Sequence, residues 1–247
     1  MICTTQAIVL NNKKFSDSSL ICNIYSEEYG KLSIIAKGAR TIKNPSGAIL
    51  EPLNHIDLVY YYKPKRNIQL FKEATIINKY YNISNNYNKI LCSIIISDII
   101  NYVSYAESPC NIIFRLINSS LKFINQSNED MVMYYYIFFK LQLLIYLGYQ
   151  PLLNQCVRCS QKINSGLFDN QLGQLACMKC SKGQTKLSQE ALETLGKLSN
   201  IHIKKIAKEL ITSTAILLEI KNYLFKFILY HIPELKKSKA FIAFNNK

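Results

Sequence analysis

The spacing of the apolar residues changes once along this chain of 247 residues, close to residue 80. Before that point successive residues alternate between an apolar and a more polar face, as over residues 20–25 and 55–63, and this period of two is typical of β-strands. After Ser84 apolar residues recur every three or four positions, the spacing of one face of an α-helix. The change predicts an α+β protein whose strands precede its helices.

Five short strands are predicted before residue 80, at residues 5–10, 20–25, 32–37, 55–63 and 68–77. Turn residues separate most of them, and one longer connection spans residues 38–52. Five strands in so short a segment fit a small closed barrel such as the OB-fold, with an open sheet or an SH3-like barrel as alternatives. We therefore predict an N-terminal OB-fold nucleic-acid-binding domain over residues 1–80.

The rest of the chain, residues 81–247, is predicted to form a helical bundle. Ser84 is the expected N-cap of the first helix, whose apolar face includes Tyr102 and Ala106, and Pro109 is expected in the first turn of the second. The predicted helices span residues 84–108, 109–124, 129–147, 189–197, 204–211 and 213–230, with Ser188 capping the fourth and Pro233 ending the last.

One predicted helix raises the question of a membrane. Residues 131–149 are apolar over about the length that spans a bilayer, but Lys140 and Gln142 lie near the middle, which favours a buried helix. The N-terminus has neither a basic region nor a long apolar run, so no signal peptide is expected. We predict a cytoplasmic protein without a membrane partner.

Two Cys-x2-Cys pairs lie in the middle of the helical region, Cys156 with Cys159 and Cys177 with Cys180. This spacing lets four sulfurs reach one tetrahedral ion, so it predicts one structural zinc in a ribbon over residues 154–184, inserted in the helical domain. Gly166 and Gly173 flank a short hairpin between the pairs. A redox Cys-x-x-Cys pair and a site that no longer binds metal are the alternatives. The remaining cysteines, at positions 3, 22, 92 and 110, are expected to be buried thiols.

No catalytic residues are expected. His55, His202 and His231 are widely separated in sequence, and the chain has no Gly-x-Ser-x-Gly, Walker or Gly-x-Gly-x-x-Gly motif. Four protein ligands would also leave zinc without an open position for water. The sequence therefore predicts a binding protein and not an enzyme.

The chain carries 30 basic and 16 acidic residues, a formal charge of +14 that favours a polyanionic partner. An AT-rich genome would also enrich lysine, but evenly. The excess is instead +5 over residues 1–80, zero over 81–155, +4 over 156–186 and +5 over 187–247. In the barrel we expect loop cations to bind nucleic-acid phosphates and nearby aromatic rings to stack on bases. The cations are Lys13 and Lys14 after the first strand, Lys37, Arg40 and Lys43 in the longest loop, and Lys63, Lys65 and Arg66 in the last turn; the rings are Tyr60, Tyr61, Tyr62 and Phe71.

Several motifs, in order along nearly the whole chain, resemble the RecO family of bacterial DNA repair proteins. They are residues 7–10 (Ala-Ile-Val-Leu), 17–20 (Asp-Ser-Ser-Leu), 25–30 (Tyr-Ser-Glu-Glu-Tyr-Gly), 37–40 (Lys-Gly-Ala-Arg), 47–52 (Gly-Ala-Ile-Leu-Glu-Pro), 147–151 (Leu-Gly-Tyr-Gln-Pro) and the first cysteine pair. The resemblance implies an OB-fold, a helical domain and an inserted zinc ribbon, without an active site. Lys37, Arg40 and Lys43 match the family's basic loop after the third strand.

The resemblance also implies a function in the RecF pathway of homologous recombination. Such proteins bind single- and double-stranded DNA, anneal complementary strands, and contact the C-terminal tail of the single-strand binding protein. They work with RecR and RecF to load the recombinase RecA, which places them in the cytoplasm near the nucleoid.

Two alternative functions remain at the level of sequence. An OB-fold and zinc-ribbon factor that binds RNA or the ribosome would prefer structured RNA to single-stranded DNA. A thiol redox enzyme would be free of metal and would carry a titratable thiolate.

Overall fold

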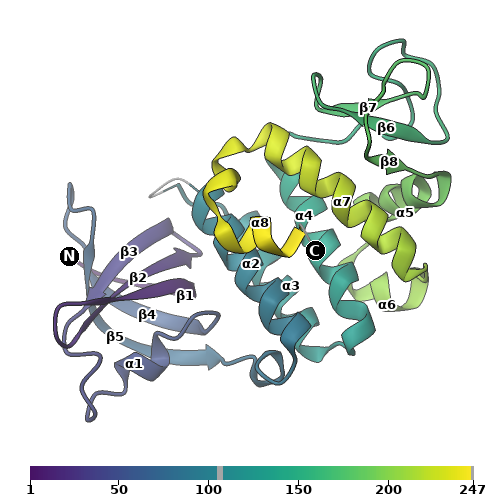
Figure 1. Ribbon diagram of the computed structural model, residues 1–247. Coiled ribbons are helices and arrows are strands. Elements are labelled where there is room, and N and C mark those ends of the chain that lie inside the picture. Colours follow the sequence, from purple (N-terminus) through teal and green to yellow (C-terminus); the bar gives the residue numbers. More distant parts are fainter. Residues whose placement is uncertain (105–107, 246–247) are drawn as a thin grey trace. The chain divides into compact units, whose positions relative to one another are not determined.

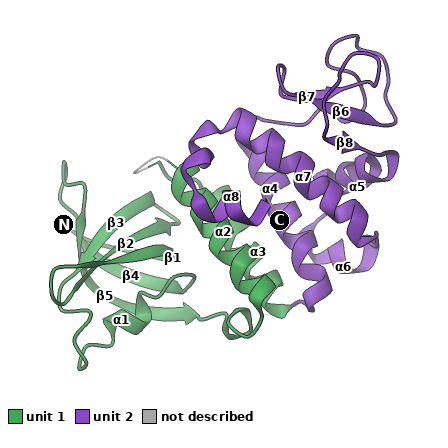
Figure 2. Cartoon of the chain, in the orientation of Figure 1, with its two compact units in different colours: residues 1–126 green, residues 127–247 purple. Residues whose placement is uncertain are grey.

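The computed structural model describes residues 1–104 and 108–245 (Figure 1). The chain divides into two compact units, unit 1 over Met1–Gln126 and unit 2 over Ser127–Lys247 (Figure 2). The division falls inside the segment predicted as one helical domain, because two of its helices group with the barrel. Ala106, predicted in the first helix, lies outside the described residues.

Unit 1 begins with the predicted five-stranded barrel. The strands pair in the order β1-β2-β3-β5-β4, and β4 pairs with β1 to close the barrel. All pairs are antiparallel except β3 with β5. This confirms the α+β fold with an N-terminal OB-fold-like barrel. The strands are β1 (Ile2–Phe15), β2 (Ser19–Ser26), β3 (Gly30–Ala36), β4 (His55–Tyr61) and β5 (Gln69–Asn78).

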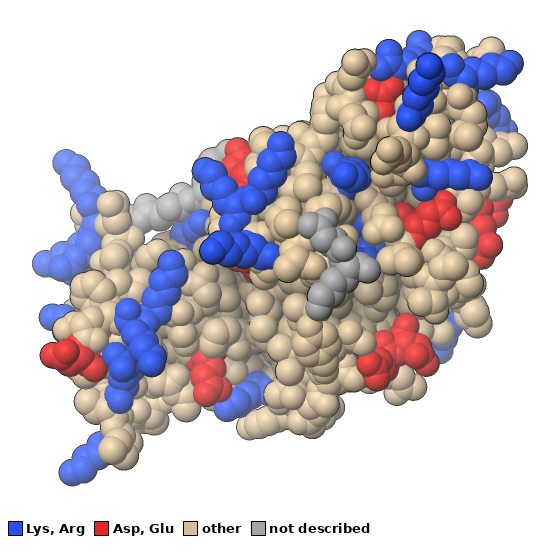
Figure 3. Space-filling view, in the orientation of Figure 1, with Lys and Arg blue, Asp and Glu red and all other residues tan. Residues whose placement is uncertain are grey.

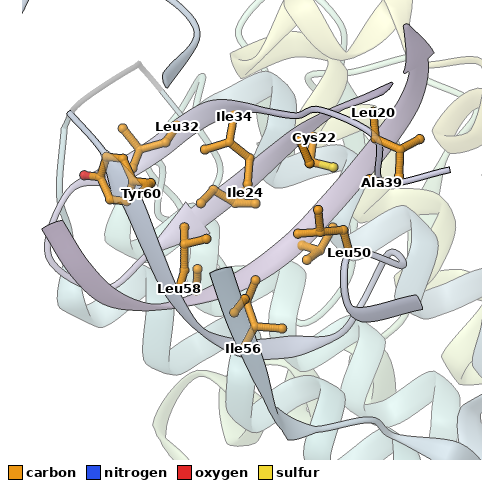
Figure 4. Packing of buried hydrophobic residues seen from close by; sticks show 14 of the residues in the cluster. Leu20, Cys22, Ile24, Leu32, Ile34, Ala39, Leu50, Ile56, Leu58 and Tyr60 are labelled. Carbon is orange, nitrogen blue, oxygen red and sulfur yellow. The ribbon is translucent and has the colours of Figure 1, made fainter. Parts of the chain in front are cut away.

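The barrel interior is filled by the alternate residues that the period of two selects (Figure 4). Leu50, from the long connection between β3 and β4, adds to this core. Tyr60 is fully buried and packs edge-to-face on Tyr29 with ring centroids 6.0 Å apart. The prediction that Tyr60 can stack on a base is therefore wrong, since its ring faces the interior. The core also includes Leu20, Cys22, Ile24, Leu32, Ile34, Ala39, Ile56 and Leu58.

Two features of the barrel differ from the prediction. Lys13 and Lys14 lie inside β1 and pair with Ile21 and Leu20 of β2, whereas they were expected after the strand. A register shift between Val9 and Asn11 interrupts the alternation of apolar and polar residues, so the alternation does not reveal that β1 continues to Phe15. The long connection also contains a short helix, α1 (Ser46–Ile49), that the sequence did not reveal.

Helices α2 (Tyr87–Val103) and α3 (Asn111–Gln126) complete unit 1 after the 3₁₀ turn η1 (Tyr81–Ile83). The cap of α2 is Asn86, whose side chain accepts the N–H of Lys89. The prediction of Ser84 as the cap is wrong, because its hydroxyl donates to the Tyr81 carbonyl and completes η1.

The segment before α3 packs closely against the β2–β3 turn. Gly30 has a φ of +67°, and a Cβ there would lie 2.4 Å from the Ser108 carbonyl oxygen. The Tyr25 hydroxyl donates to the Cys110 carbonyl, 3.4 Å away. Only glycine fits at position 30, because both its backbone conformation and the space around it exclude a side chain.

Unit 2 is built on two mostly buried helices, α4 (Val132–Tyr146) and α7 (Thr214–His231). Ser188 caps α5 as the sequence predicts, and Ser213, the first residue of the predicted helix 213–230, is the N-cap of α7. Pro233 ends α7 but also opens a further turn, so the last helix, α8, was missed. None of the described helices is both long and apolar enough to span a membrane. The other helical elements are η2 (Glu129–Met131), α5 (Gln189–Asn200), η3 (Ile203–Lys205), α6 (Ile206–Glu209), η4 (Pro233–Lys237) and α8 (Lys239–Asn245).

The cysteine segment forms a small sheet in the order β7-β6-β8. The predicted hairpin is present, as β6 (Gly166–Asp169) pairs antiparallel with β7 (Gln174–Ala176). A third strand, β8 (Lys186–Leu187), lies beyond the predicted end of the ribbon and leads into α5 beside α7 (Figure 1). We call residues 154–187 the ribbon.

Candidate nucleic-acid interface and metal centre

The predicted barrel cations are all exposed, but they form two groups. The first group, here the hairpin cluster, surrounds the turn between β1 and β2. The Arg40 guanidinium donates to the Ser16 carbonyl (3.2 Å) and its backbone N–H to the Ser18 carbonyl (2.8 Å), which draws the long loop onto this turn. The hairpin cluster consists of Lys13, Lys14, Lys37, Arg40 and Lys43.

The second group, the loop cluster, consists of Lys63, Lys65 and Arg66 between β4 and β5. Gln69 is 1% exposed and holds this loop from beneath. Its amide nitrogen donates to the carbonyls of Lys63 (3.2 Å) and Arg66 (2.7 Å), and its amide oxygen accepts the Lys63 N–H (2.9 Å). The three cations are thus presented by a loop of fixed shape.

Two residues of the loop cluster, Lys65 and Arg66, border a hollow of about 340 Å³. Lys31, at the start of β3, contributes to its wall and was missed by the sequence analysis. Its ammonium donates to the Asn101 carbonyl, 2.5 Å away, and burial lowers its pKa. The parallel pairing of Ile34 with Gln69 brings β3 beside the loop, a contact between residues distant in sequence.

Lys37 of the hairpin cluster follows the last residue of β3, whereas Lys65 and Arg66 of the loop cluster lie beside Lys31 near its start. The strand between them is about 20 Å long, at about 3.3 Å per residue. Between them the outer face of β2 and β3 is only partly covered, and the Ser33 hydroxyl donates to the Asn23 side chain there (2.7 Å). Aromatic groups are sparse near the clusters. Tyr61 is 39% exposed and Phe15, a residue not predicted, is 50% exposed, whereas Tyr62 and Phe71 pack against the core. Basic side chains stand out from the barrel and from the ribbon in Figure 3.

The four predicted metal ligands converge in unit 2. The sulfurs of Cys156, Cys159, Cys177 and Cys180 all lie within 4.8 Å of one another, and those of Cys159 and Cys177 are 3.9 Å apart. A tetrahedral ion with bonds of about 2.3 Å requires sulfur separations of about 3.8 Å. The donor set therefore fits one thiophilic ion with closed coordination.

The electrostatics of the cluster also suit a cation. Burial raises the pKa of Cys156, but backbone N–H groups of Cys177, Cys159 and Arg158 outweigh this and lower it to about 6. The pKa of Cys180 rises to about 12, chiefly through its hydrogen bond to Cys177. The thiols thus share protons among closely spaced sulfurs, and a divalent cation would displace those protons.

A second layer of contacts orients the first cysteine pair. The Arg158 backbone N–H donates to the Cys156 sulfur (3.4 Å), and its guanidinium donates to both carboxylate oxygens of Asp169 on β6 (2.5 and 3.2 Å). This ion pair lowers the pKa of Asp169, which is itself nearly buried. The pair could not be predicted from the sequence, because its partners are eleven residues apart.

The ribbon turn also rests on α7. The Tyr230 hydroxyl donates to the Gln171 carbonyl (2.7 Å), and the His231 ring lies 3.1 Å from the Gly173 carbonyl. Gly173 has a φ of +65°, and a Cβ there would overlap the Tyr230 ring. His231 is therefore a structural contact, like the buried His55 ring, which lies 3.1 Å from Gln6 Oε1.

Comparison with known proteins accounts for most of the chain. The family model described as "Recombination protein O N terminal" matches residues 1–80, and the one described as "Recombination protein O C terminal" matches residues 84–240. Proteins called "DNA repair protein RecO" are similar to the chain. That of Pelodictyon phaeoclathratiforme is 30% identical over 71% of this chain and 67% of its own length. That of Thermoanaerobacter sp. is 25% identical over 96% of both chains. The chain therefore belongs to the RecO family of recombination proteins.

Proposed function

We propose that this protein acts in DNA repair and homologous recombination by binding single-stranded DNA across the outer face of β2 and β3. The observation that carries the proposal is the placement of the hairpin cluster and the loop cluster at the two ends of that face. OB-folds hold single strands on this strand face between the corresponding loops. Family membership supports the role in repair and recombination.

The composition of the surface favours weakly selective binding. Lysine and arginine neutralise phosphates and release counterions without reading sequence. Phe15 and Tyr61 are the exposed rings described beside the clusters, so few bases would be stacked and the others stay free to pair. A surface that screens the charge of two DNA strands while exposing their bases promotes annealing, so we infer that the protein anneals complementary strands. We also propose that it acts by binding and not as an enzyme.

The proposed partners follow from the family. We propose that the protein binds double- as well as single-stranded DNA and contacts RecR and the tail of the single-strand binding protein. We propose further that it loads the recombinase RecA in the cytoplasm together with RecR and RecF. The closed four-sulfur cluster supports this binding role over a redox one, because all four thiols face one another.

We also propose that the cysteine cluster holds one structural zinc. Four thiolates in a closed arrangement are typical of zinc in ribbons, where the ion supplies folding energy and takes no part in catalysis. Cys156, Cys159, Cys177 and Cys180 would be its ligands, and Arg158 would orient the first pair.

An annealing assay on DNA coated with the cognate single-strand binding protein tests the proposed function. The protein is expected to accelerate pairing of two complementary oligonucleotides, followed by fluorescence transfer between their labels. A protein that binds the same DNA but leaves the annealing rate unchanged would be a DNA-binding protein without the mediator role.

An Asp169→Asn change tests whether the ion pair between Arg158 and Asp169 supports the proposed zinc site. The amide cannot accept two charge-assisted hydrogen bonds from Arg158, so the first cysteine pair should loosen. Outer-layer partners of metal ligands affect affinity about 10- to 100-fold. We expect zinc transfer to a chromogenic chelator to be accelerated by about that factor. Transfer at the unchanged rate would show that the ion pair does not support the site.

A further inference from the structure

A second basic hollow, of about 400 Å³, lies in unit 2 between the end of the ribbon and α7. Lys186 enters from β8 and Lys226 from α7, and both side chains are exposed. Gln184, Thr185 and Asn222 add neutral polar groups to the wall. Its volume falls within the range of small-ligand sites, and its lining is suited to a polar, anionic group.

The hollow also offers an unused hydrogen-bond acceptor. Asn245 lines it and is only 5% exposed. Its amide nitrogen donates to the Phe241 carbonyl (2.7 Å), but its Oδ1 has no hydrogen-bond partner in the described part of the chain. A buried acceptor without a donor is costly, so a ligand group that donates an N–H or O–H to this oxygen would be favoured in the hollow.

Glu219 also lines the hollow, but its carboxylate is already used. It accepts the backbone N–H of Ser188 and, at 3.1 Å, the Ser188 hydroxyl. Both carboxylate oxygens of Glu219 therefore accept hydrogen bonds from Ser188 at the start of α5. These bonds partly offset the negative charge, which weakens the repulsion between Glu219 and an anion beside Lys186 and Lys226.

The exposed face of α7 continues from the hollow to a group of aromatic rings. Asn222, Lys226 and Tyr230 are four residues apart and lie on one face, about 12 Å long in total. Tyr230 is 43% exposed and its ring lies 5.0 Å from that of His231. The Tyr149 side chain is 37% exposed, and the centroid of its ring lies 5.0 Å from that of His231, with an angle of 30° between the two ring planes.

We propose that these residues form a second binding track for a single nucleic-acid strand, here the α7 track, consisting of Lys186, Asn222, Lys226, Tyr230 and Asn245. A phosphate lies between Lys186 and Lys226, the sugar or base edge meets Asn245, and a neighbouring base stacks on Tyr230. Cations next to an exposed ring are the elements of single-strand sites. An acidic peptide would use the lysines, and its backbone N–H groups would suit the Asn245 oxygen, but it has no base to stack on Tyr230. The inference rests on the proposed function, to which it adds a place for the second strand.

The test measures single-stranded DNA binding by fluorescence anisotropy in a protein whose loop cluster has been replaced by alanine. In that background, Lys186→Ala with Lys226→Ala should weaken binding about 25-fold at 0.1 M salt, since each phosphate contact contributes about 0.7 to the salt slope. Lys204→Ala with Lys208→Ala is the matched control. Both are exposed lysines of the same unit outside the track, and their removal should have little effect.

A second measurement locates the strand. Iodouracil-substituted DNA should crosslink to Tyr230 in the full chain, and a Tyr230→Leu change should remove that crosslink while the protein keeps its helical circular dichroism. Equal affinities for the track variant and its lysine control would overturn the inference. A different outcome would point to a protein partner and overturn the inference. In it, wild-type protein and the Tyr230→Leu variant bind a fluorescent oligoglutamate equally well, and DNA does not crosslink to Tyr230. If wild-type protein binds no DNA, the proposed function itself fails.

Discussion

A Cys156→Ser variant is expected to lose the metal and the ordered ribbon together. The ribbon has only three short strands, so its own apolar core is small. In such modules the free energy of metal binding is largely the free energy of folding, about 10–16 kcal/mol in zinc-finger peptides. We expect the zinc content to fall from about one ion per chain to nearly none, and limited proteolysis to cut within residues 154–187.

The matched control is Cys110→Ser, which makes the same chemical change outside the cluster. The Cys110 contact to Tyr25 uses the backbone carbonyl and not the thiol, so this variant should keep both its zinc and its resistance to proteolysis. If Cys156→Ser protein retained stoichiometric zinc, or a ribbon as resistant as that of the wild type, the structural role of the ion would be refuted.

Replacing Lys63, Lys65 and Arg66 by alanine should produce the largest loss of single-stranded DNA affinity. Gln69 fixes the loop through backbone carbonyls, so the change removes three charges without removing the contacts that shape the loop. Each phosphate contact contributes about 0.7 to the slope of log affinity against log salt concentration. We therefore expect the three substitutions to lower the affinity for single-stranded DNA about 100-fold at 0.1 M salt, as measured by fluorescence anisotropy.

A variant of equal net charge separates local contacts from overall attraction. Lys72→Ala, Lys204→Ala and Lys208→Ala together also remove three positive charges, and all three lie outside the loop cluster. Lys72 already pairs with Glu73, 2.8 Å away. This control should lose only a small part of the affinity. An equal loss in both triple variants would mean that net charge alone attracts DNA and that the loop cluster is no site.

Features set by neighbouring residues could be predicted from the sequence. The alternation at Leu20, Cys22 and Ile24 identified a barrel strand, and Ser188 and Ser213 marked two helix starts correctly. The cysteine pairs could be assigned to one site because Cys-x2-Cys spacing is itself a local geometry. The end of β1 was predicted wrongly, because a bulge interrupts its period and pairing with β2 carries the strand on to Phe15.

Features set by pairing between distant segments could not be predicted. Lys31 reaches the loop cluster only because β3 runs parallel to β5, and Asn245 meets Lys186 only after the chain has folded back across α7. The burial of Tyr60 depended on which face of β4 closes the barrel, and alternation alone left that choice open among three consecutive tyrosines.

The salt dependence of single-stranded DNA binding tests the central claim most directly. Log affinity plotted against log salt should be linear and steep for the wild-type protein, and its slope should fall by about 2 when Lys63, Lys65 and Arg66 are replaced by alanine. A flat response in the wild type, or an unchanged slope in the variant, would contradict binding of DNA at the barrel.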